Sequence, residues 1–221
     1  MGAAIICIAG NGKKNEVWRF TLHGRVIRDF QDNLQLGYQG IIAYKIKTNN
    51  MSLIIEVRGF KPAFGNNCYI APNATIAGDV LMGDDCSIWF NAVIRGDVNS
   101  IRMGNKVNVQ DGAIIHCTYM KTATIIGNNV SIGHNAIVHG CVIDDNVLVG
   151  MGAIIMDNAK IGSNSIIAAG AVVLENTIVE PGSIFAGVPA KKVKNIPGEM
   201  ISGAISRVAN NYVMYAEWFK V

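Results

Sequence analysis

The 221-residue sequence has few aromatic side chains and no long apolar run. Aromatic residues make up only 7% of the chain, although 50% of its residues are hydrophobic and 24 are glycine. This balance predicts a large core built from small and β-branched side chains. The apolar runs fall far short of the about 20 residues that cross a bilayer, so no membrane association is expected. The apolar opening, MGAAIICIAG, has no basic residues ahead of it and makes a poor secretory signal.

The five cysteines lack the CxxC spacing of zinc and redox motifs. Their odd number also argues against a full disulfide framework. Because disulfides are rare in reducing compartments, we expect a cytoplasmic protein. The cysteines are Cys7, Cys68, Cys86, Cys117 and Cys141.

Positive charge is concentrated near the start of the chain. Residues 1–50 contain seven Lys and Arg against three Asp and Glu, whereas residues 51–221 contain twelve against thirteen. The near-neutral body gives no electrostatic reason to expect nucleic acid as a partner.

Residues 1–50 also show no internal repeat. The stretch VWRFTLHGRVIRDF within them is compatible with a hairpin, but nothing in it suggests chemistry. We expect an N-terminal extension that is not part of the native fold, with Met51 as the natural start. A basic targeting segment is the alternative, although its acidic residues and the lack of serine enrichment fit it poorly.

What the rest of the sequence does contain is a large apolar residue at intervals of six, with two interruptions. A small residue follows four positions later in most of these units, and Gly, Asp or Asn fills many positions between. The large residues are Phe64, Ile70, Ile76, Met82, Ile88, Ile94, Met103, Val109, Ile115, Ile126, Ile132, Val138, Ile143, Val149, Ile155, Ile161, Ile167, Val173, Val179 and Phe185.

A period of six is too short for a helical repeat and too long for simple strand alternation. Short strands joined by tight turns produce it, and three of them make one triangular coil. We therefore predict an all-β fold over residues 51–196, a parallel β-helix of six to seven stacked coils. Asn, Gly and Asp at the turns suit a positive φ. Cys68 and Cys86 occupy the small inward position, so they are expected to be core residues.

The period ends before Pro197, and residues 197–221 show an imperfect helical spacing of apolar residues. We predict a C-terminal α-helix packed along the outside of the coils, against strand faces or a neighbouring subunit. The apolar residues are Met200, Ile201, Ile205, Val208, Val213, Tyr215 and Phe219.

Three of the four histidines lie between positions 116 and 139. If a loop follows His116, then Ile115 and Val138 are one coil apart, and the histidines after them take equivalent positions. Neighbouring strands lie about 4.8 Å apart, so His116 and His139 can approach one metal ion. His134 lies one strand earlier, near another corner of the triangle.

Within one subunit, His134 is not expected to meet the other two histidines. In a threefold assembly one corner faces a different corner of the neighbour, so His134 of one chain can complete the site of the next. The alternative is that these histidines are ordinary surface or interface residues. His23 lies outside the repeat and has no expected role.

Four segments resemble the γ-class carbonic anhydrase family, which are left-handed β-helix trimers of the hexapeptide-repeat superfamily. They are IRGDV at 94–98, NVQDGAIIH at 108–116, IGHNAIVHG at 132–140 and GVPAKKV at 187–193. The last also occurs in hexapeptide acyltransferases, so the first three carry the resemblance. It extends from about Met51 to Val221 and implies a left-handed β-helix and a homotrimer.

By this resemblance His116, His134 and His139 bind Zn²⁺ or Fe²⁺ at a site shared by two subunits. Three neutral histidines leave one position for water, and a bound dication lowers the pKa of that water to about 7. The resulting metal-bound hydroxide attacks CO₂. The implied activity is therefore the reversible hydration of CO₂ to bicarbonate.

The resemblance also gives roles to five polar residues. Arg95, Asp97 and Asp111 match residues whose ion pairs organise the site and the subunit interface. An equally good interpretation is that Arg95, Asp97 and Asp111 only stabilise the trimer. Gln110 matches a glutamine that hydrogen-bonds the metal-bound solvent, and Asn108 matches a nearby polar position.

The chain departs from the archaeal prototype of the family in its acidic residues. Val98 stands where the prototype has an acid, and the segment CTYMKTAT after His116 contains no carboxylate. The proton released in each turnover must then leave through buffer or another group, or the substrate is different.

Two other functions remain open. One is thioester hydrolysis or acyl transfer from acyl-CoA on the same scaffold, for which Lys191, Lys192 and Lys194 are a hint of a phosphate-binding rim. Hexapeptide acyltransferases need one catalytic histidine rather than three, which argues against this alternative. The other is a non-catalytic trimeric assembly module.

Overall fold

The structure is a computed structural model that describes residues 21–22, 25–26, 35–36, 42–43 and 52–220. The chain divides into two units, Met1–Asn49 and Asn50–Val221. Most of residues 1–50 lie outside the described residues. That they are not part of the native fold therefore stays a prediction.

The first unit contains two antiparallel pairs of short strands. β1 (Thr21–Leu22) pairs with β2 (Arg25–Val26), within the stretch that is compatible with a hairpin. β3 (Gln35–Leu36) pairs with β4 (Ile42–Ala43).

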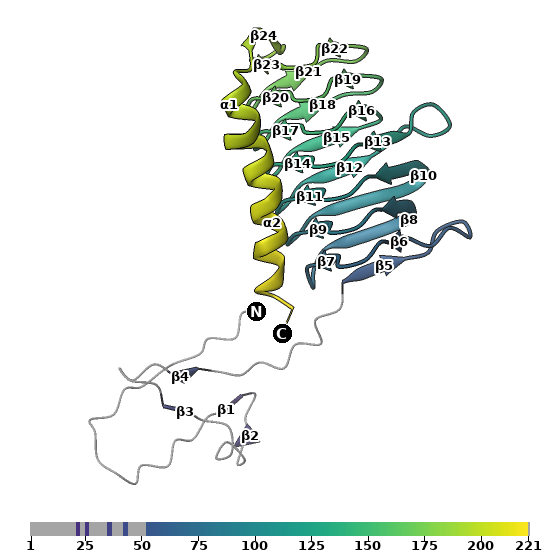
Figure 1. Cartoon of the computed structure of the whole chain (residues 1–221). Coiled ribbons are helices and arrows are strands. Elements are labelled where there is room, and N and C mark those ends of the chain that lie inside the picture. Colours follow the sequence, from purple (N-terminus) through teal and green to yellow (C-terminus); the bar gives the residue numbers. More distant parts are fainter. Residues whose placement is uncertain (1–20, 23–24, 27–34, 37–41, 44–51, 221) are drawn as a thin grey trace. The chain divides into compact units, whose positions relative to one another are not determined.

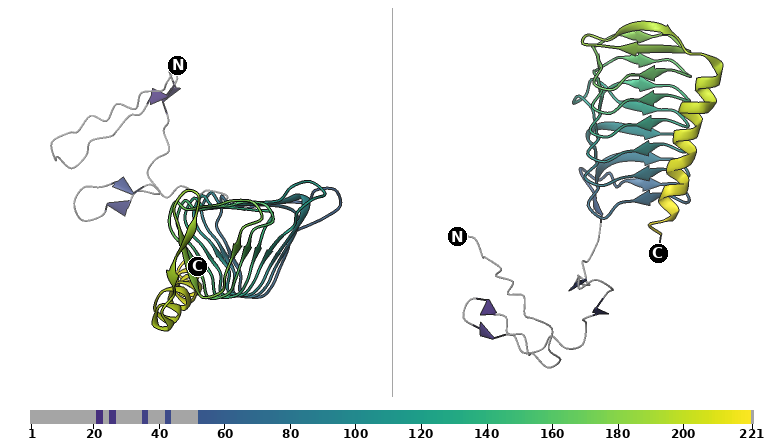
Figure 2. Two further views of the ribbon diagram at one scale, coloured as in Figure 1. Left: turned by 90° about the horizontal axis from the view of Figure 1, so that it is seen from above. Right: turned by 90° about the vertical axis from the view of Figure 1, so that its left-hand side faces the viewer.

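The second unit is a left-handed parallel β-helix of about seven coils, which confirms the fold predicted from the repeat. Figure 1 shows the coils stacked one above another, and the view along the stack in Figure 2 shows their three-sided outline. Each complete coil adds one strand to each of three faces, here named face 1, face 2 and face 3.

The strands are distributed over the faces as follows. Face 1 contains β7 (Tyr69–Ile70), β9 (Ser87–Ile88), β11 (Asn108–Val109), β14 (Ser131–Ile132), β17 (Leu148–Val149), β20 (Ile166–Ile167), β23 (Ser183–Ala186) and β24 (Lys191–Asn195). Face 2 contains β5 (Leu53–Ile55), the first parts of β8 (Thr75–Met82) and β10 (Val93–Met103), then β12 (Ile114–His116), β15 (Ile137–His139), β18 (Ile154–Ile155) and β21 (Val172–Val173). Face 3 contains β6 (Ala63–Phe64), the last parts of β8 and β10, then β13 (Thr124–Ile126), β16 (Val142–Ile143), β19 (Lys160–Ile161) and β22 (Ile178–Val179).

The interior is filled by the large residues of the repeat. From Ile76 to Phe185, every one of them is at most 7% exposed. Full burial of one such side chain contributes about 1.5–3 kcal/mol, so the stacked series is the main source of stability. Phe64 and Ile70 are only half-buried, because they lie in the first coils of the stack.

The prediction that Cys68 and Cys86 are both enclosed core residues is half wrong. Cys86 is 1% exposed, but Cys68 is only partly buried, because it lies one coil nearer to the N-terminal end. A hydrogen bond with Cys86 lowers the pKa of the Cys68 thiol to about 7.

Asparagine provides most of the non-glycine corner residues that have a positive φ, as the turn residues predict. Stacked corners also hydrogen-bond to one another along the axis. Asn129 and Asn146 have φ of 55° and 58°, and the Nδ2 of the first donates to the Oδ1 of the second at 3.2 Å. Each coil is therefore fixed to the next by its corners as well as by its strands.

The first interruption of the period is a strand that continues around a corner. β8 and β10 run from face 2 to face 3, and their pairing shifts register between Gly96 and Ile101. The two strands approach closely here: a Cβ at Gly96 would lie 2.6 Å from the carbonyl oxygen of Asp79. Glycine in the sequence IRGDV is therefore required by the close approach of the strands.

The second interruption is a loop, as predicted. It joins β12 to β13 across residues 117–123 and projects from the stack in Figure 1.

At the C-terminal end of the stack, faces 1 and 2 are covered by the chain itself. β24 turns back and pairs antiparallel with β23. Beside it, the N–H of Ala190 donates to the carbonyl of Val172 in β21. At the other end, β5 exposes Leu53, Ile54 and Ile55 by 40% or more. The two ends of the β-helix are therefore different.

The predicted C-terminal helix is present. It comprises α1 (Gly198–Met200), a π-helical segment η1 (Ile201–Ser206) and α2 (Arg207–Glu217), and it runs along the outside of the coils (Figure 2). Ile205, Ala209 and Ala216 are buried, and Tyr212 is half-buried between them. Of the seven predicted apolar residues only Ile205 is fully buried. The other buried positions of the helix are Ala209 and Ala216, whose small side chains let the helix lie close to the coils.

An aromatic cluster fixes the far end of this helix. Trp89, next to β9, packs against Tyr212 at 5.3 Å and Phe219 at 5.5 Å between ring centroids. Phe219 also contacts Tyr69 and Phe90. The indole N–H of Trp89 donates to Ser87 Oγ at 3.0 Å, so this buried ring has its polar group satisfied.

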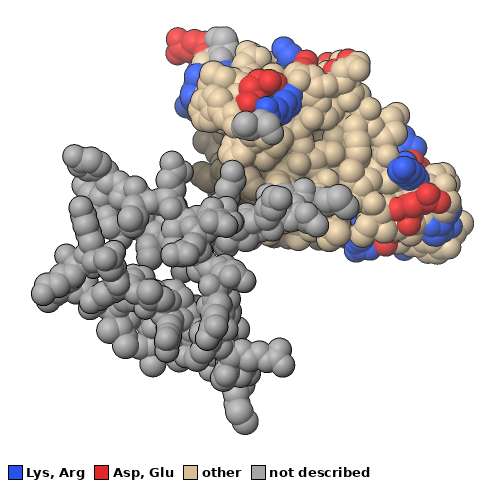
Figure 3. Space-filling view, turned by 90° about the horizontal axis from the view of Figure 1, so that it is seen from below, with Lys and Arg blue, Asp and Glu red and all other residues tan. Residues whose placement is uncertain are grey.

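The charged residues do not form one continuous surface of a single sign in the view of Figure 3. There, Lys and Arg lie close to Asp and Glu toward the edges of the β-helix, with a broad area of other residues between them. None of the helices within residues 52–220 has the length and apolar character needed to span a membrane.

Candidate metal centre

His116 and His139 lie side by side on neighbouring coils. They are register partners in the parallel pair of β12 and β15, which confirms the register predicted from the spacing. His116 Nδ1 lies 3.1 Å from His139 Nε2. Each imidazole therefore directs one ring nitrogen toward the other, and one nitrogen of each ring remains for other partners.

Those remaining nitrogens each face a carboxylate. His116 Nε2 lies 3.2 Å from Asp97 Oδ1, and His139 Nδ1 lies 3.1 Å from Asp157 Oδ1. Partial burial raises the pKa of Asp97, but hydrogen bonds from Arg95 and His116 outweigh it, so the pKa falls below its usual value. Asp97 can therefore accept a hydrogen bond as a carboxylate.

The pKa of His116 is lowered, first by burial and then by the positive charge of Arg95. A lowered pKa favours the neutral imidazole, which is the form that binds a metal ion. Arg95 itself forms an ion pair with Asp97 at 2.6 Å. We call Arg95, Asp97, His116, His139 and Asp157 the His116 cluster.

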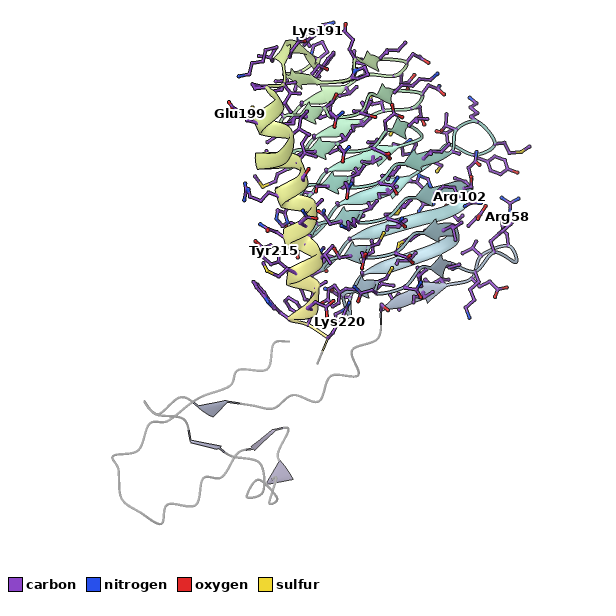
Figure 4. The ribbon with its side chains drawn as sticks, in the orientation of Figure 1. Arg58, Arg102, Lys191, Glu199, Tyr215 and Lys220 are labelled. Carbon is purple, nitrogen blue, oxygen red and sulfur yellow. The ribbon has the colours of Figure 1, made fainter. Side chains whose placement is uncertain are left out.

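The His116 cluster is bordered by residues from two loops. Arg58 donates from Nη1 to the carbonyl of Asp97 at 3.4 Å, and its guanidinium lies 5.8 Å from the ring centroid of Tyr119. Tyr119 is on the loop after His116. In Figure 4, Arg58 lies on the side of the β-helix where this loop projects, away from the helix that carries Tyr215.

His134 belongs to a different cluster, beside α2. Its Nδ1 lies 2.9 Å from Asp111 Oδ2, and its Nε2 lies 3.5 Å from the hydroxyl of Tyr212. Burial, followed by the charge of Asp111, raises the pKa of Tyr212 to about 12, so its hydroxyl is protonated at neutral pH.

A buried chain of amides and a hydroxyl supports the strand that leads to Asp111. Gln110 donates from Nε2 to Asn108 Oδ1 at 3.0 Å, and Asn108 donates from Nδ2 to Ser131 Oγ at 2.8 Å. Gln110 is 5% exposed and Asn108 is 1% exposed. We call Asn108, Gln110, Asp111, His134 and Tyr212 the His134 cluster.

The two clusters lie at opposite edges of face 2. His134 lies in the turn before β15 and His139 is the last residue of β15, so the length of one strand lies between them. Two nitrogens bound to one zinc ion lie only about 3.3 Å apart. Within residues 52–220, no three His, Cys, Asp or Glu side chains of one chain come together as a metal site.

The donor set of the His116 cluster fits a metal ion. The separation of 3.1 Å between the two imidazole nitrogens is close to the about 3.3 Å expected for neighbouring ligands of a tetrahedral ion. Carboxylates on the opposite nitrogens are the usual partners of metal-binding histidines. The cluster thus offers two imidazole ligands from one chain.

The residues near these clusters that the sequence analysis missed include Arg58 and Tyr119, described above, and four more. These four are Asp157, Thr118, Thr122 and Tyr212. Asp157 is 18 residues beyond His139, which is the length of one coil, so the repeat itself was the signal that could have found it. Tyr212 had no such signal, because its position depends on how the helix docks.

Cys117, next to His116, belongs to the buried core. Its side chain is 1% exposed and contacts the Ser100 carbonyl oxygen and Thr124 Oγ1, each at 3.5 Å. Burial raises the pKa of this thiol. Alternation along β12 thus places His116 outside the coil and Cys117 inside it.

Known sequences resemble this chain over most of the β-helix. The family described as "Bacterial transferase hexapeptide (six repeats)" matches residues 64–96 and 140–175. A protein of Methanocaldococcus jannaschii named "Probable carbonic anhydrase" is 56% identical over 151 residues, which cover 68% of this chain and 94% of the relative. "Gamma carbonic anhydrase 2, mitochondrial" of Arabidopsis thaliana is 37% identical over 74% of this chain and 60% of the relative.

Solved structures share the same architecture. The crystal structure of a hexapeptide transferase family protein from Anaplasma phagocytophilum superimposes with a TM-score of 0.72 and 36% sequence identity. The alignment covers 76% of this chain and 98% of that one.

Proposed function

Because the chain belongs to the γ-carbonic anhydrase family of hexapeptide-repeat proteins, we propose that it catalyses the reversible hydration of CO₂ to bicarbonate with a bound metal ion. The observation that carries the proposal is the 3.1 Å approach of His116 Nδ1 to His139 Nε2, with a carboxylate behind each ring. Zn²⁺ or Fe²⁺ is the expected ion, since both accept imidazole ligands.

The working form is a homotrimer in which the His116 cluster of one protomer faces the His134 cluster of the next. His116 and His139 then supply two ligands and His134 of the partner subunit supplies the third. Support comes from the incomplete ligand set in a single chain. In the same arrangement Arg95 and Asp97 meet the edge that contains Asp111, where they can extend their ion pair across the interface.

When bound, the metal ion supplies a Lewis acid that makes water nucleophilic toward CO₂ at neutral pH. The residues of the chain position the reactants. Asp97 and Asp157 orient the two imidazoles, and Asn108 fixes the amide of Gln110, which is the expected hydrogen-bonding partner of the attacking water. Hydration of CO₂ releases one proton per bicarbonate, and the loop at 117–123 has no carboxylate to accept it. Buffer is the expected acceptor.

Metal content tests the proposal. Full-length protein purified anaerobically without chelator should contain about one zinc or iron per chain, and stopped-flow assays should show CO₂ hydration that His139→Gln abolishes. His23→Gln is the matched control, because His23 lies outside the repeat, and it should leave both properties unchanged. Less than about a tenth of an ion per chain, with no uptake on reconstitution, would overturn the proposal. The histidines would then be interface residues of a non-catalytic assembly module.

Acyl transfer is the second candidate, favoured by the solved relative that is named a hexapeptide transferase. Lys191, Lys192 and Lys194 are exposed on β24 and could meet CoA phosphates, although Lys192 is paired with Glu180. Acyl-CoA turnover by metal-free protein, without CO₂ hydration, would favour this candidate. Cytoplasmic location stays a prediction for either function.

A further inference from the structure

Asp157, which contacts His139, also accepts hydrogen bonds from two threonine hydroxyls. Thr122 Oγ1 donates to its Oδ1 at 2.7 Å, and Thr118 Oγ1 lies 3.1 Å from Oδ2 and 3.2 Å from Oδ1. With His139 Nδ1 at 3.1 Å, three side chains converge on one carboxylate that is 22% exposed. Asp157 is therefore well placed to fix the ring of His139.

The two threonines form one unit. The Thr118 N–H donates to Thr122 Oγ1 at 3.1 Å, and the two residues also form an isolated antiparallel bridge. Both lie in the loop between β12 and β13, and Thr122 is 7% exposed. The loop therefore closes on itself and presents two hydroxyl groups to a carboxylate that lies two coils further along the stack.

The direction of each hydrogen bond follows from this arrangement. Both threonine hydroxyls can only donate to the carboxylate, since a carboxylate has no proton to give. The convergence of three donors on its two oxygens favours the carboxylate form of Asp157. As a carboxylate, Asp157 accepts the Nδ1–H of His139. The lone pair of His139 is then on Nε2, the nitrogen that faces His116.

We propose that Asp157, held by Thr118 and Thr122, is the positioning residue that fixes His139 in the tautomer and orientation required of a metal ligand. The inference rests on the proposed function, because it assigns His139 to a metal ion. The inference gives the loop at 117–123 a role. The loop has no carboxylate of its own, and it orients a carboxylate that lies two coils further along the stack.

Zinc affinity of the full-length protein tests the inference. We expect Asp157→Asn to weaken zinc binding about 10–100-fold in competition with a chromophoric chelator, the usual effect of losing such a partner. The new amide can donate to Nδ1 and so move the imidazole proton to the ligand nitrogen. Thr118→Val with Thr122→Val keeps the carboxylate but removes its support, and should weaken binding by a smaller factor.

The matched control is Asp145→Asn. Asp145 is exposed, and its Oδ1 accepts the backbone N–H of Asn128 at a corner. Asn105 and Asn128 accept the same kind of bond at the equivalent corners of other coils, so asparagine can replace Asp145. This variant should bind zinc like the wild type. All variants should keep the wild-type circular dichroism and the same size in solution.

A second readout concerns the tautomer of His139 rather than the metal. In protein labelled with ¹⁵N-histidine, the signal assigned to His139 should show Nδ1–H in the wild type and lose it in Asp157→Asn. The inference is wrong if the wild type binds zinc and Asp157→Asn binds it with the same affinity and keeps the same His139 tautomer. That result would leave the proposed function intact. No zinc binding by the wild type would overturn the proposed function itself, and with it this inference.

Discussion

The thiol of Cys68 differs from the other described cysteines in both exposure and acidity. It is partly buried, and the hydrogen bond with Cys86 lowers its pKa to about 7. The pKa of Cys86 is raised by the same hydrogen bond and by burial, and burial also raises the pKa of Cys117 and Cys141. Since the thiolate is the nucleophile, these four thiols should react in a definite order.

We expect iodoacetamide to alkylate Cys68 before Cys86, Cys117 and Cys141, with a rate that rises as the pH passes through about 7. The sign follows from the pKa: above it the thiolate predominates, and below it the unreactive thiol does. Timed alkylation followed by peptide mass spectrometry measures the order. Cys86→Ala removes the hydrogen-bond donor and should shift the rate profile of Cys68 to higher pH. An unshifted profile would show that Cys86 is not the cause.

The placement of His116 and His139 was predictable from the sequence, because the number of residues in each coil determines which residues are register partners. Ile115 and Val138 belong to the same row of the core, so His116 and His139 had to be neighbours. Their carboxylate partners were less accessible to prediction. Asp157 was within reach of the same counting, but the threonines that fix it lie in a loop, where no period applies.

At the scale of elements, the C-terminal helix shows the limits of pattern analysis most clearly. Its existence followed from the end of the six-residue period, but its buried face did not follow from apolar residues alone. Ala209 and Ala216 are buried because the helix lies close to the coils, and η1 changes the phase of the side chains before α2 begins. Packing against face 1 therefore decides which side of the helix is covered.

Trp89 should be the main anchor of this helix. Trp89→Ala removes a side chain that is 6% exposed and contacts Tyr212 and Phe219, so we expect a loss of about 3–5 kcal/mol in the free energy of unfolding. Guanidinium unfolding at a fixed protein concentration measures it.

Trp218→Ala is the matched control for this experiment. Trp218 is 63% exposed and stacks on Tyr215, so its removal should cost less than about 1 kcal/mol. Equal losses in the two variants would contradict the anchoring role of Trp89.

At the scale of the whole molecule, the separation of the two clusters predicts complementation between inactive variants. His134→Ala trimers and His139→Ala trimers should each lack metal, because every interface is incomplete. In trimers mixed at random from equal amounts of both chains, about one quarter of the interfaces combine an intact His116 cluster with an intact His134 cluster. Co-expressed chains should therefore recover about a quarter of the wild-type metal and hydration activity.

The same experiment distinguishes a shared site from one within a single chain. A mixture of separately purified variants that do not exchange subunits is the control and should stay inactive. Activity in the co-expressed trimers no greater than in the parent variants would contradict the shared site. The sequence suggested such sharing through the place of His134 near another corner and through the family resemblance, since periodicity describes one chain and not its neighbours.

The different ends of the β-helix restrict how copies can stack on one another. β24 and the segment around Ala190 pair with the last coil, whereas in residues 52–220 nothing pairs with the lower edge of β5. Head-to-tail addition of one β-helix to the next needs both ends open, and this is the route to an endless fibre. At the C-terminal end the outermost strand of face 1 is β24, whose exposed Lys191, Lys192 and Lys194 disfavour edge pairing. Head-to-tail growth is therefore disfavoured on this face.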